Sequence, residues 1–225
     1  MATTMVDTFP TALFGFKSQD IDIERQTLSG GTALSGETDV LAVDGGGRVY
    51  AAFDEGDLID RDKVLAWRAL LSILEEGVTQ IVVPFCDIRH QPYGGEHRVT
   101  YGDGATHSDG SLFSGGGPFA EVTAPAALRA TSIEFNGVFA QPLIGGEWFT
   151  VEHPTKGPRA YRVRKVTDAG VSFRPPLREA VAIGETLDFA NPRCLMIQDP
   201  EGGKPSSRIA NRRHTVAQIR FVEAR

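Results

Sequence analysis

Only one stretch of this chain has the apolar spacing of a long helix, and this limits the folds available to it. In residues 60–76, apolar side chains fall on one helical face at Val64, Trp67, Leu71 and Leu74. Asp60 or Asp62 is available as the N-terminal cap of this helix. Elsewhere, short runs rich in Val, Ile, Phe and Thr are separated by turns, and the chain contains 25 Gly and 13 Pro. The pattern predicts a mainly β protein with one flanking helix packed across a sheet.

Strands are expected wherever apolar residues alternate or run together between turn residues. Asp44 and the glycines at 45–47 predict a hairpin turn, and Gly30–Gly31 predicts a bend or bulge. Pro84 favours an edge position or a bulge, because proline cannot donate to a strand ladder. Polar residues 201–213 predict a loop. The predicted strands outside the densest region are 21–27, 28–43, 48–56, 79–88, 128–137, 193–198 and 215–223.

The densest series of predicted strands lies between residues 142 and 192. About five short strands with glycine turns between them, within roughly 50 residues, are typical of a small barrel. We therefore expect a small OB-like or SH3-like β-barrel at 140–191. It is inserted into a β-sandwich domain formed by residues 1–139 together with 192–225.

Two features of the central region stay open at this point. Residues 92–118 include eight glycines and predict a projecting loop or a loose hairpin, which in a compact domain is usually functional. Cys86 and Cys194 each lie in an apolar run, which predicts two buried thiols. The sequence does not decide whether these cysteines are paired, nor what the glycine-rich loop does.

The charge balance limits the partners. The formal net charge is −6, which argues against sequence-independent binding to nucleic acid, since that requires clustered cations. The alternation at 161–166, YRVRKV, indicates a half-buried strand with a solvated face instead. The first 20 residues lack a signal peptide's pattern, and no apolar run approaches a membrane span of about 18 residues. We expect a soluble protein made in the cytoplasm.

No catalytic, metal or cofactor site follows from the spacing of reactive residues. Cys86, His90, His97 and His107 lie close in sequence, but only the first two have a zinc-like spacing, and no second pair follows. Cys86 continues a strand-like run instead of opening a helix, which disfavours a cysteine hydrolase. Residues 103–109 lack the closing glutamate of a calcium loop, and no glycine-rich turn leads into a helix as phosphate binding requires. We expect no enzyme and no cofactor.

Two longer patterns carry a family resemblance. Residues 67–92 run from a Trp-Arg-Ala helix through a glycine to a buried strand and a proline turn. Residues 142–197 contain a Gly-Glu-Trp strand, a Tyr-x-Val strand and a Pro-Pro-Leu-Arg segment. This order resembles the distal tail proteins of tailed bacteriophages. The resemblance covers residues 28–92 and 128–222 and implies a tail-tube-like β-sandwich that forms a ring, usually sixfold, in the virion.

The resemblance also implies partners and structural or interface residues. The ring would join the tail tube protein to the tail hub protein and to receptor-binding or fibre proteins. Among the matching positions, none of them catalytic in the family, the structural or interface candidates are Trp67, Arg68, Trp148, Pro175, Pro176 and Arg178. One alternative is another tail ring, such as the tail tube or a tail completion protein. Another is a carbohydrate-binding tail module, with Trp148, Phe149 and Tyr161 as a sugar platform.

Overall fold

In the computed structural model the chain divides into two compact units, which are considered separately. Unit 1 comprises Met1–Cys86, Gly157–Arg159 and Arg193–Arg225, and unit 2 comprises Asp87–Lys156 and Ala160–Pro192. The structure describes residues 7–24, 27–32, 34–42, 47–85, 98–99, 108, 113–114, 119–137, 139, 141–202, 205–210 and 214–224.

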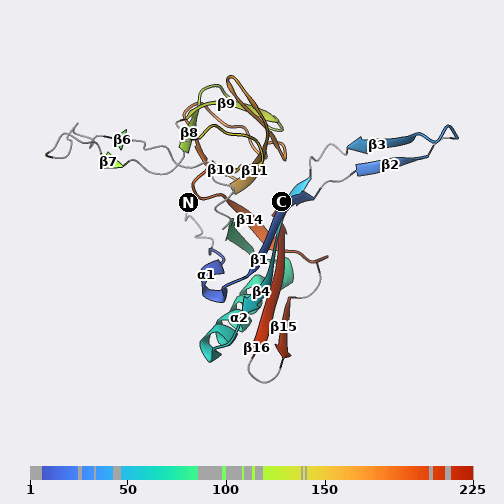
Figure 1. Cartoon of the computed structure of the whole chain (residues 1–225), viewed down its shortest axis with the longest axis vertical. Helices are drawn as coiled ribbons and strands as arrows, with labels where there is room; N and C mark the ends of the chain where they lie inside the picture. The colour runs from blue at the N-terminus through green and yellow to red at the C-terminus, as the bar shows by residue number, and fades with distance from the viewer. Residues whose placement is uncertain are drawn as a thin grey trace. The chain divides into compact units, whose positions relative to one another are not determined.

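Unit 1 is organised around one six-stranded antiparallel sheet. Its strands run in the order β1–β4–β16–β14–β5, and β15 pairs with β16 beside this path (Figure 1). Strand β16 is central, because β4 pairs along one side of it while β15 and β14 pair with successive parts of the other. The strands are β1 (Ser18–Glu24), β4 (Arg48–Asp57), β5 (Gln80–Pro84), β14 (Arg193–Gln198), β15 (Ser206–Ala210) and β16 (His214–Glu223).

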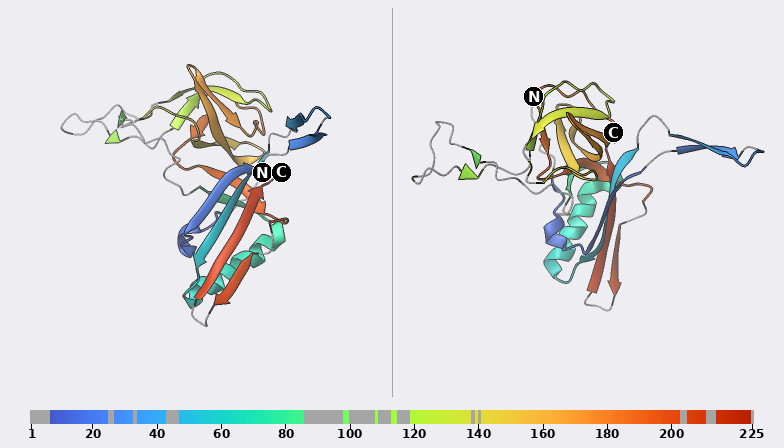
Figure 2. Two further views of the ribbon diagram at one scale, coloured as in Figure 1. Left: turned by 45° about the vertical axis from the view of Figure 1, so that its right-hand side comes forward. Right: turned by 45° about the horizontal axis from the view of Figure 1, so that its top comes forward.

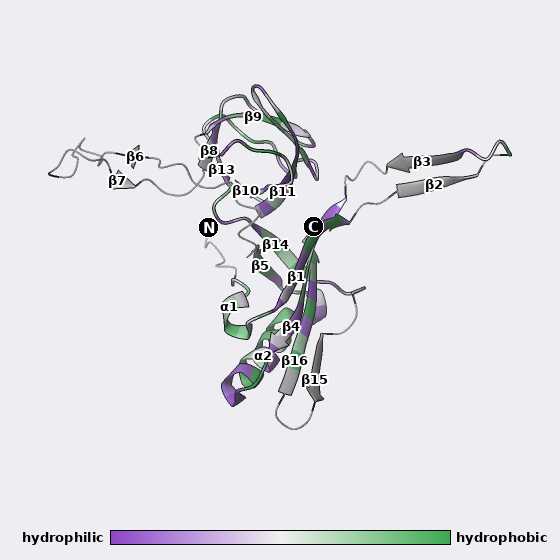
Figure 3. Cartoon of the chain, viewed as in Figure 1, coloured by the Kyte–Doolittle hydropathy of each residue, from purple (hydrophilic) through white to green (hydrophobic). Residues whose placement is uncertain are grey.

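Aromatic rings hold the helix of unit 1 on this sheet. Helix α2 (Arg61–Leu74) carries both hydrophilic and hydrophobic residues and runs alongside the strands (Figures 2 and 3). Its buried Trp67 meets Phe14 edge to face, with ring centroids 5.1 Å apart. Phe14 ends the short helix α1 (Thr11–Phe14), and Phe16 lies between Trp67 and Phe53 of β4. Residues just before β1 therefore form the layer between helix and sheet.

The predicted helix is confirmed, but it ends earlier than residue 76. At Glu75 and Glu76 the backbone turns left-handed, with φ of 45° and 54°, and the chain continues as a 3-10 turn, η1 (Glu75–Gly77). Left-handed residues cannot extend a right-handed helix. Asp60 occupies the cap position with extended backbone, without a side-chain cap hydrogen bond.

The segment predicted as one strand at 28–43 is a two-stranded ribbon. β2 (Thr27–Thr32) pairs with β3 (Thr38–Ala42), and neither pairs with another strand in the described part of the chain. The pairing is irregular between Ser29 and Thr32, as Gly30–Gly31 predicted. The turn lies at 34–37, where Gly36 has a φ of 83°, so the ribbon turns earlier than predicted. Residues 43–46 lie outside the described residues, and β4 pairs with β1 and β16.

Unit 2 contains a closed six-stranded barrel with the order β10–β11–β12–β9–β8–β13. The first three residues of β11 group with unit 1, and β6 (Arg98–Val99) and β7 (Phe113–Ser114) form a separate pair. The barrel strands are β8 (Phe119–Val122), β9 (Ser132–Gly137), β10 (Trp148–His153), β11 (Gly157–Thr167), β12 (Gly170–Arg174) and β13 (Thr186–Asp188).

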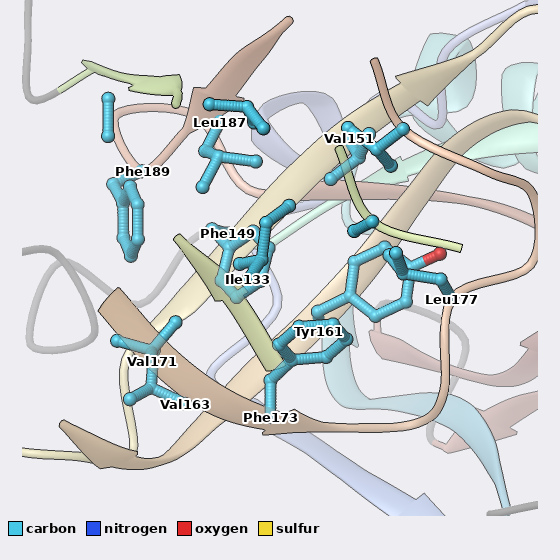
Figure 4. Close-up of a cluster of buried hydrophobic side chains, with 14 residues drawn as sticks. Ile133, Phe149, Val151, Tyr161, Val163, Val171, Phe173, Leu177, Leu187 and Phe189 are labelled. Atoms are coloured by element: carbon cyan, nitrogen blue, oxygen red, sulfur yellow. The ribbon is translucent and has the colours of Figure 1, made fainter. Parts of the chain in front are cut away.

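Aromatic and branched side chains fill the barrel (Figure 4). Phe149, Tyr161 and Phe173 converge from neighbouring strands, with ring centroids of 5.5 Å from Phe149 to each of the other two and 5.3 Å between those two. Val163 and Val171 point into the same core, so alternate residues of β11 and β12 face inward and the residues between them face outward. This alternation decides which charges the barrel presents.

The mainly β fold with one long helix and a small barrel is confirmed. The barrel is larger than predicted, since β8 and β9 precede residue 140. Where a β-sandwich was predicted, the described residues of unit 1 form one sheet with a helix layered on it. The β2–β3 ribbon is separate from that sheet. The predicted loop at 201–213 contains strand β15. Among the described residues, no helix is long and apolar enough to cross a membrane.

Candidate interaction surfaces

The two predicted positions on α2 divide between core and surface. Trp67 is fully buried in the aromatic layer of unit 1, and its indole N–H has no hydrogen-bond acceptor among the described residues. Arg68 is exposed, and its backbone carbonyl accepts a hydrogen bond of 3.0 Å from the Ser72 hydroxyl. Trp67 therefore stabilises the fold, and only Arg68 is placed to meet a partner directly.

The Gly-Glu-Trp motif stabilises the turn that leads into barrel strand β10. The carboxylate of Glu147 accepts hydrogen bonds from the backbone N–H groups of Ile144 (2.7 Å) and Gly145 (2.8 Å). Trp148 begins β10 and is buried, with the guanidinium of Arg162 5.4 Å from its ring centroid. A cation over an indole face is electrostatically attracted. The motif thus orients one of the outward arginines of β11.

The Pro-Pro-Leu-Arg segment is fixed from inside the barrel. Pro175 is buried after a cis peptide bond, Pro176 is half-buried, and the N–H of Arg178 donates to the Tyr161 hydroxyl at 3.1 Å. That hydroxyl also lies 2.7 Å from Nε2 of the buried His153. The predicted residues Pro175, Pro176 and Arg178 therefore lie in one segment that is held against the barrel, and they act first as barrel structure.

Beside this segment, Thr155 holds the exposed carboxylate of Glu179. Its backbone N–H and its hydroxyl both donate to one carboxylate oxygen at 3.2 Å. The backbone hydrogen bond, supported by the hydroxyl and by the charge of His153, lowers the pKa of Glu179 below its ordinary value. Hydrogen bonds to the charged form have this effect.

The sugar platform considered from the sequence is not exposed. Trp148 is 1% exposed, and Phe149 and Tyr161 are fully buried. A stacking platform needs an accessible ring face, so these three aromatics cannot supply one in this conformation.

The reactive residues weighed for metal binding fall outside the described residues. This applies to Cys86, His90, His97 and His107, and to the question of pairing with Cys86. Cys194 is buried, as predicted. The described residues contain no group of three or more His, Cys, Asp or Glu arranged to hold a metal ion. Most of the glycine-rich loop at 92–118 is likewise outside the described residues.

Sheet edges are the interaction surfaces that sequence reasoning missed. Strand β1 ends the sheet on one side, and β15 pairs with β16 alone among the described strands. On β1 the N–H of Ile23 donates to the side chain of its neighbour Asp22 at 2.7 Å. A charged side chain that takes an edge N–H protects the edge from indiscriminate pairing. By contrast, the Thr8–Val82 bridge covers the outer side of β5.

Acidic side chains are concentrated near β1, the edge strand of the same sheet. Asp20 accepts a hydrogen bond of 3.1 Å from the Tyr50 hydroxyl. Arg220 forms ion pairs with Asp199 at 3.0 Å and with Glu24 at 3.6 Å. Partial burial first, and then the hydrogen bond to Asp20, raise the pKa of Tyr50 above its ordinary value. The face is therefore a connected polar network on β1, β4 and β16.

A buried ion pair lies within unit 1. The Arg159 guanidinium is 3.7 Å from the Glu223 carboxylate, and both side chains are almost fully buried. Arg159 also donates to the carbonyls of Leu195 and Ala224, while Glu223 accepts from the N–H of Val49. Burial of two charges is tolerated when hydrogen bonds complete the pair, so we assign this group a structural role.

Comparison with known proteins identifies no family for this chain. No family model matches the chain, and no curated protein sequence matches it either.

Proposed function

We propose that this chain is a structural, non-catalytic ring subunit of a phage tail tip, of the distal tail type. The observation that carries the proposal is the sheet of unit 1, which leaves two strands, β1 and β15, with unpaired outer edges in the described structure. Unpaired strand edges recruit other strands. The family resemblance of the helix and barrel motifs supplies the biological setting.

The two edges suit a head-to-tail arrangement. They belong to opposite sides of one sheet, so β15 of one copy can pair with β1 of the next. A heterologous contact of this kind produces a closed ring when its rotation closes. Sixfold closure is the expectation taken from the resemblance.

Charge favours this pairing over pairing of like edges. β1 carries Asp20, Asp22 and Glu24 at alternate positions, whereas β15 and the residues after it include Arg208 and the pair at 212–213. Opposite charges on neighbouring strands are favourable and like charges are not. The acidic face of β1 would also suit a lumen through which DNA moves, because like charges repel.

The barrel supports a tail-tip position over a plain tube. A tube subunit needs only its stacking sheet, whereas a closed barrel provides a second body for other proteins. In this arrangement the ring lies between the tail tube protein and the hub, with receptor-binding or fibre proteins as further partners.

Negative-stain microscopy and mass photometry of the full chain test the ring directly. We expect sixfold rings, lost in Asp22→Lys and in Arg208→Glu, and regained in the double variant, because the reversed charges match again. Asp62→Lys, on an exposed α2 residue, is the matched control and should keep the ring. A wild-type chain that stays monomeric at high concentration would refute the proposal.

A further inference from the structure

Two turns of the barrel in unit 2 leave large apolar side chains in solvent. Leu128 is 58% exposed and Ile183 is 64% exposed. The neighbouring residues Pro125, Ala127 and Ala182 are exposed as well. An exposed apolar patch rimmed by polar residues marks an interaction site, provided that its members form one surface. We call these five residues the apolar platform.

Backbone hydrogen bonds join the two segments of the platform into one surface. The N–H of Ala126 donates to the carbonyl of Val181 at 2.9 Å, and the N–H of Val181 donates to the carbonyl of Ala126 at 2.8 Å. Both side chains are buried in the barrel core. Residues on either side of such an inward pair point outward. Pro125 and Ala127 therefore lie on the outer surface beside Ala182.

The two halves of the platform have the same local structure. A backbone hydrogen bond closes each turn, at 3.0 Å across residues 127–130 and at 3.4 Å across residues 182–185. The large apolar residue comes second in each turn, and the third residue is left-handed, with a φ of 68° at Arg129 and 84° at Gly184. Glycine adopts this conformation freely, whereas a residue with a side chain is strained in it. The first turn thus keeps a long cationic side chain where the second has none.

The two ends of the platform differ in charge. At the second turn a Cβ on Gly184 would lie 3.7 Å from Oε1 of the exposed Glu121, so a carboxylate borders the space that the glycine leaves. The charged residues of the paired segments and their neighbours are Arg129, Arg178 and Glu179 at the first turn, and Glu121, Glu134 and Glu185 at the second. The first end therefore has two arginines and one glutamate, and the second has three glutamates.

We propose that the apolar platform binds the platform of a second copy of this chain, with the first turn of each copy against the second turn of the other. A two-fold contact of this kind pairs identical patches. Leu128 then packs on the partner's Ile183, and Arg129 enters the space at the partner's Gly184, beside the partner's Glu121. Turning the contact round would bring the arginines of the two copies together, which repulsion disfavours.

The charges direct this contact, and the apolar side chains supply its strength. Arg129 and Arg178 also interact within their own copy, so the proposal does not depend on unpaired cations. Burial of apolar surface is the main favourable term in association. A second copy suits the platform because each end presents what the other end requires, a cation for a space bordered by a carboxylate. The contact uses unit 2 alone, so the inference is independent of ring formation by unit 1.

Analytical ultracentrifugation of the full chain tests the contact. Every variant is made in the Asp22→Lys chain, in which the proposed ring contact is removed, and this parent should form dimers. Ile183→Lys should weaken dimerisation about tenfold or more, because it places a charge at the centre of an apolar contact. The matched control, Ile144→Lys, changes an isoleucine of unit 2 that is 86% exposed and lies outside the platform, so it should dimerise like the parent. Dimers of the parent without rings of the wild type would refute the ring and support the platform.

Charge exchange and crosslinking test the direction of the contact. Arg129→Glu and Glu121→Arg should each weaken dimerisation, and the double variant should regain it, because the charges match again. A mixture of Leu128→Cys and Ile183→Cys chains should form a reducible crosslink that neither variant forms alone and that the parent lacks. Crosslinking keeps the test decisive if a charge variant fails to fold.

Four results would each overturn the proposal. They are a parent chain that stays monomeric at high concentration, equal weakening by Ile144→Lys and Ile183→Lys, a double charge variant that dimerises no better than the single ones, and cysteine variants that crosslink to themselves as readily as to each other.

Discussion

The sheet of unit 1 and the barrel of unit 2 differ in whether their outermost strands are paired on both sides. Among the described residues the sheet ends on β1 and leaves β15 paired on one side only, whereas the pairing of β10 with β13 closes the barrel. An open edge can join another backbone, while a closed barrel offers only the side chains on its outside. The sheet of unit 1 therefore offers backbone groups at its open edges, whereas the barrel of unit 2 offers side chains.

The largest effect is expected where the N-terminal aromatic layer supports unit 1. Phe14→Ala should lower the free energy of unfolding by about 3–5 kcal/mol, because Phe14 is fully buried between Trp67 and Phe16. Denaturant titration measures this loss, and hydrogen exchange should rise in β4 and α2 and not in the barrel. The neighbouring Leu13→Ala, at a more exposed position, is the control and should change much less. Equal losses in both variants would contradict this account of the layer.

Breaking the buried ion pair should rank next. Glu223→Gln leaves Arg159 as a buried charge without its counter-ion, so we expect a loss of about 3 kcal/mol in urea unfolding. Replacing both residues, as Arg159→Met with Glu223→Leu, removes both charges and should cost less than the single change. If the double variant is the less stable one, the pair contributes net stability and our view of it is wrong.

A smaller effect tests the barrel side of the comparison. Tyr161→Phe removes the hydroxyl that meets His153 and the N–H of Arg178, which leaves buried polar groups without this partner. We expect a loss of about 1–2 kcal/mol, confined to unit 2, measured by thermal unfolding and hydrogen exchange. Increased exchange in β1 or β16 instead would show that the effect is not local.

The smallest effect concerns pH. Hydrogen bonds from Thr155 lower the folded-state pKa of Glu179, so this group stabilises the fold fully above its unfolded pKa of about 4.3. The contribution is lost as the pH falls through the lower folded value. Thr155→Ala removes the hydroxyl bond, so the Glu179 pKa should rise toward its ordinary value in a carboxyl carbon-13 NMR titration. An unchanged titration would mean that the backbone N–H alone sets it.

The sequence predicted those elements whose side-chain period matches their burial. Trp67 and Leu74 mark the buried side of α2, and Phe149 and Val151 mark the inner side of β10. Strand β15 was missed because it is polar and is defined by backbone pairing with β16, which no side-chain period reports. Strand β8 was missed for a related reason. It has only four residues and directly follows a glycine-rich segment, so it shows no clear side-chain period.

The candidate surfaces were harder to predict than the fold. Trp148, Pro175 and Pro176 stood out as motif residues, but their buried or half-buried side chains serve the barrel. The alternation at 161–166 predicted the solvated side of β11 correctly, since Tyr161 and Val163 are buried and Arg164 and Lys165 are exposed. The one-residue bulge at Arg164 was not predicted, because it depends on the pairing with β12. Open edges are likewise invisible in a sequence, since they depend on which strands pair.

The position of β16 at the centre of the sheet sets the order in which the units can form during synthesis. It pairs with β4, β14 and β15, yet it follows all three of them along the chain. The barrel strands all precede it, so a growing chain can complete the barrel before the sheet has its central strand. Because pairing between distant segments is slow, we expect the barrel to fold first and the sheet to wait on the ribosome until β16 emerges.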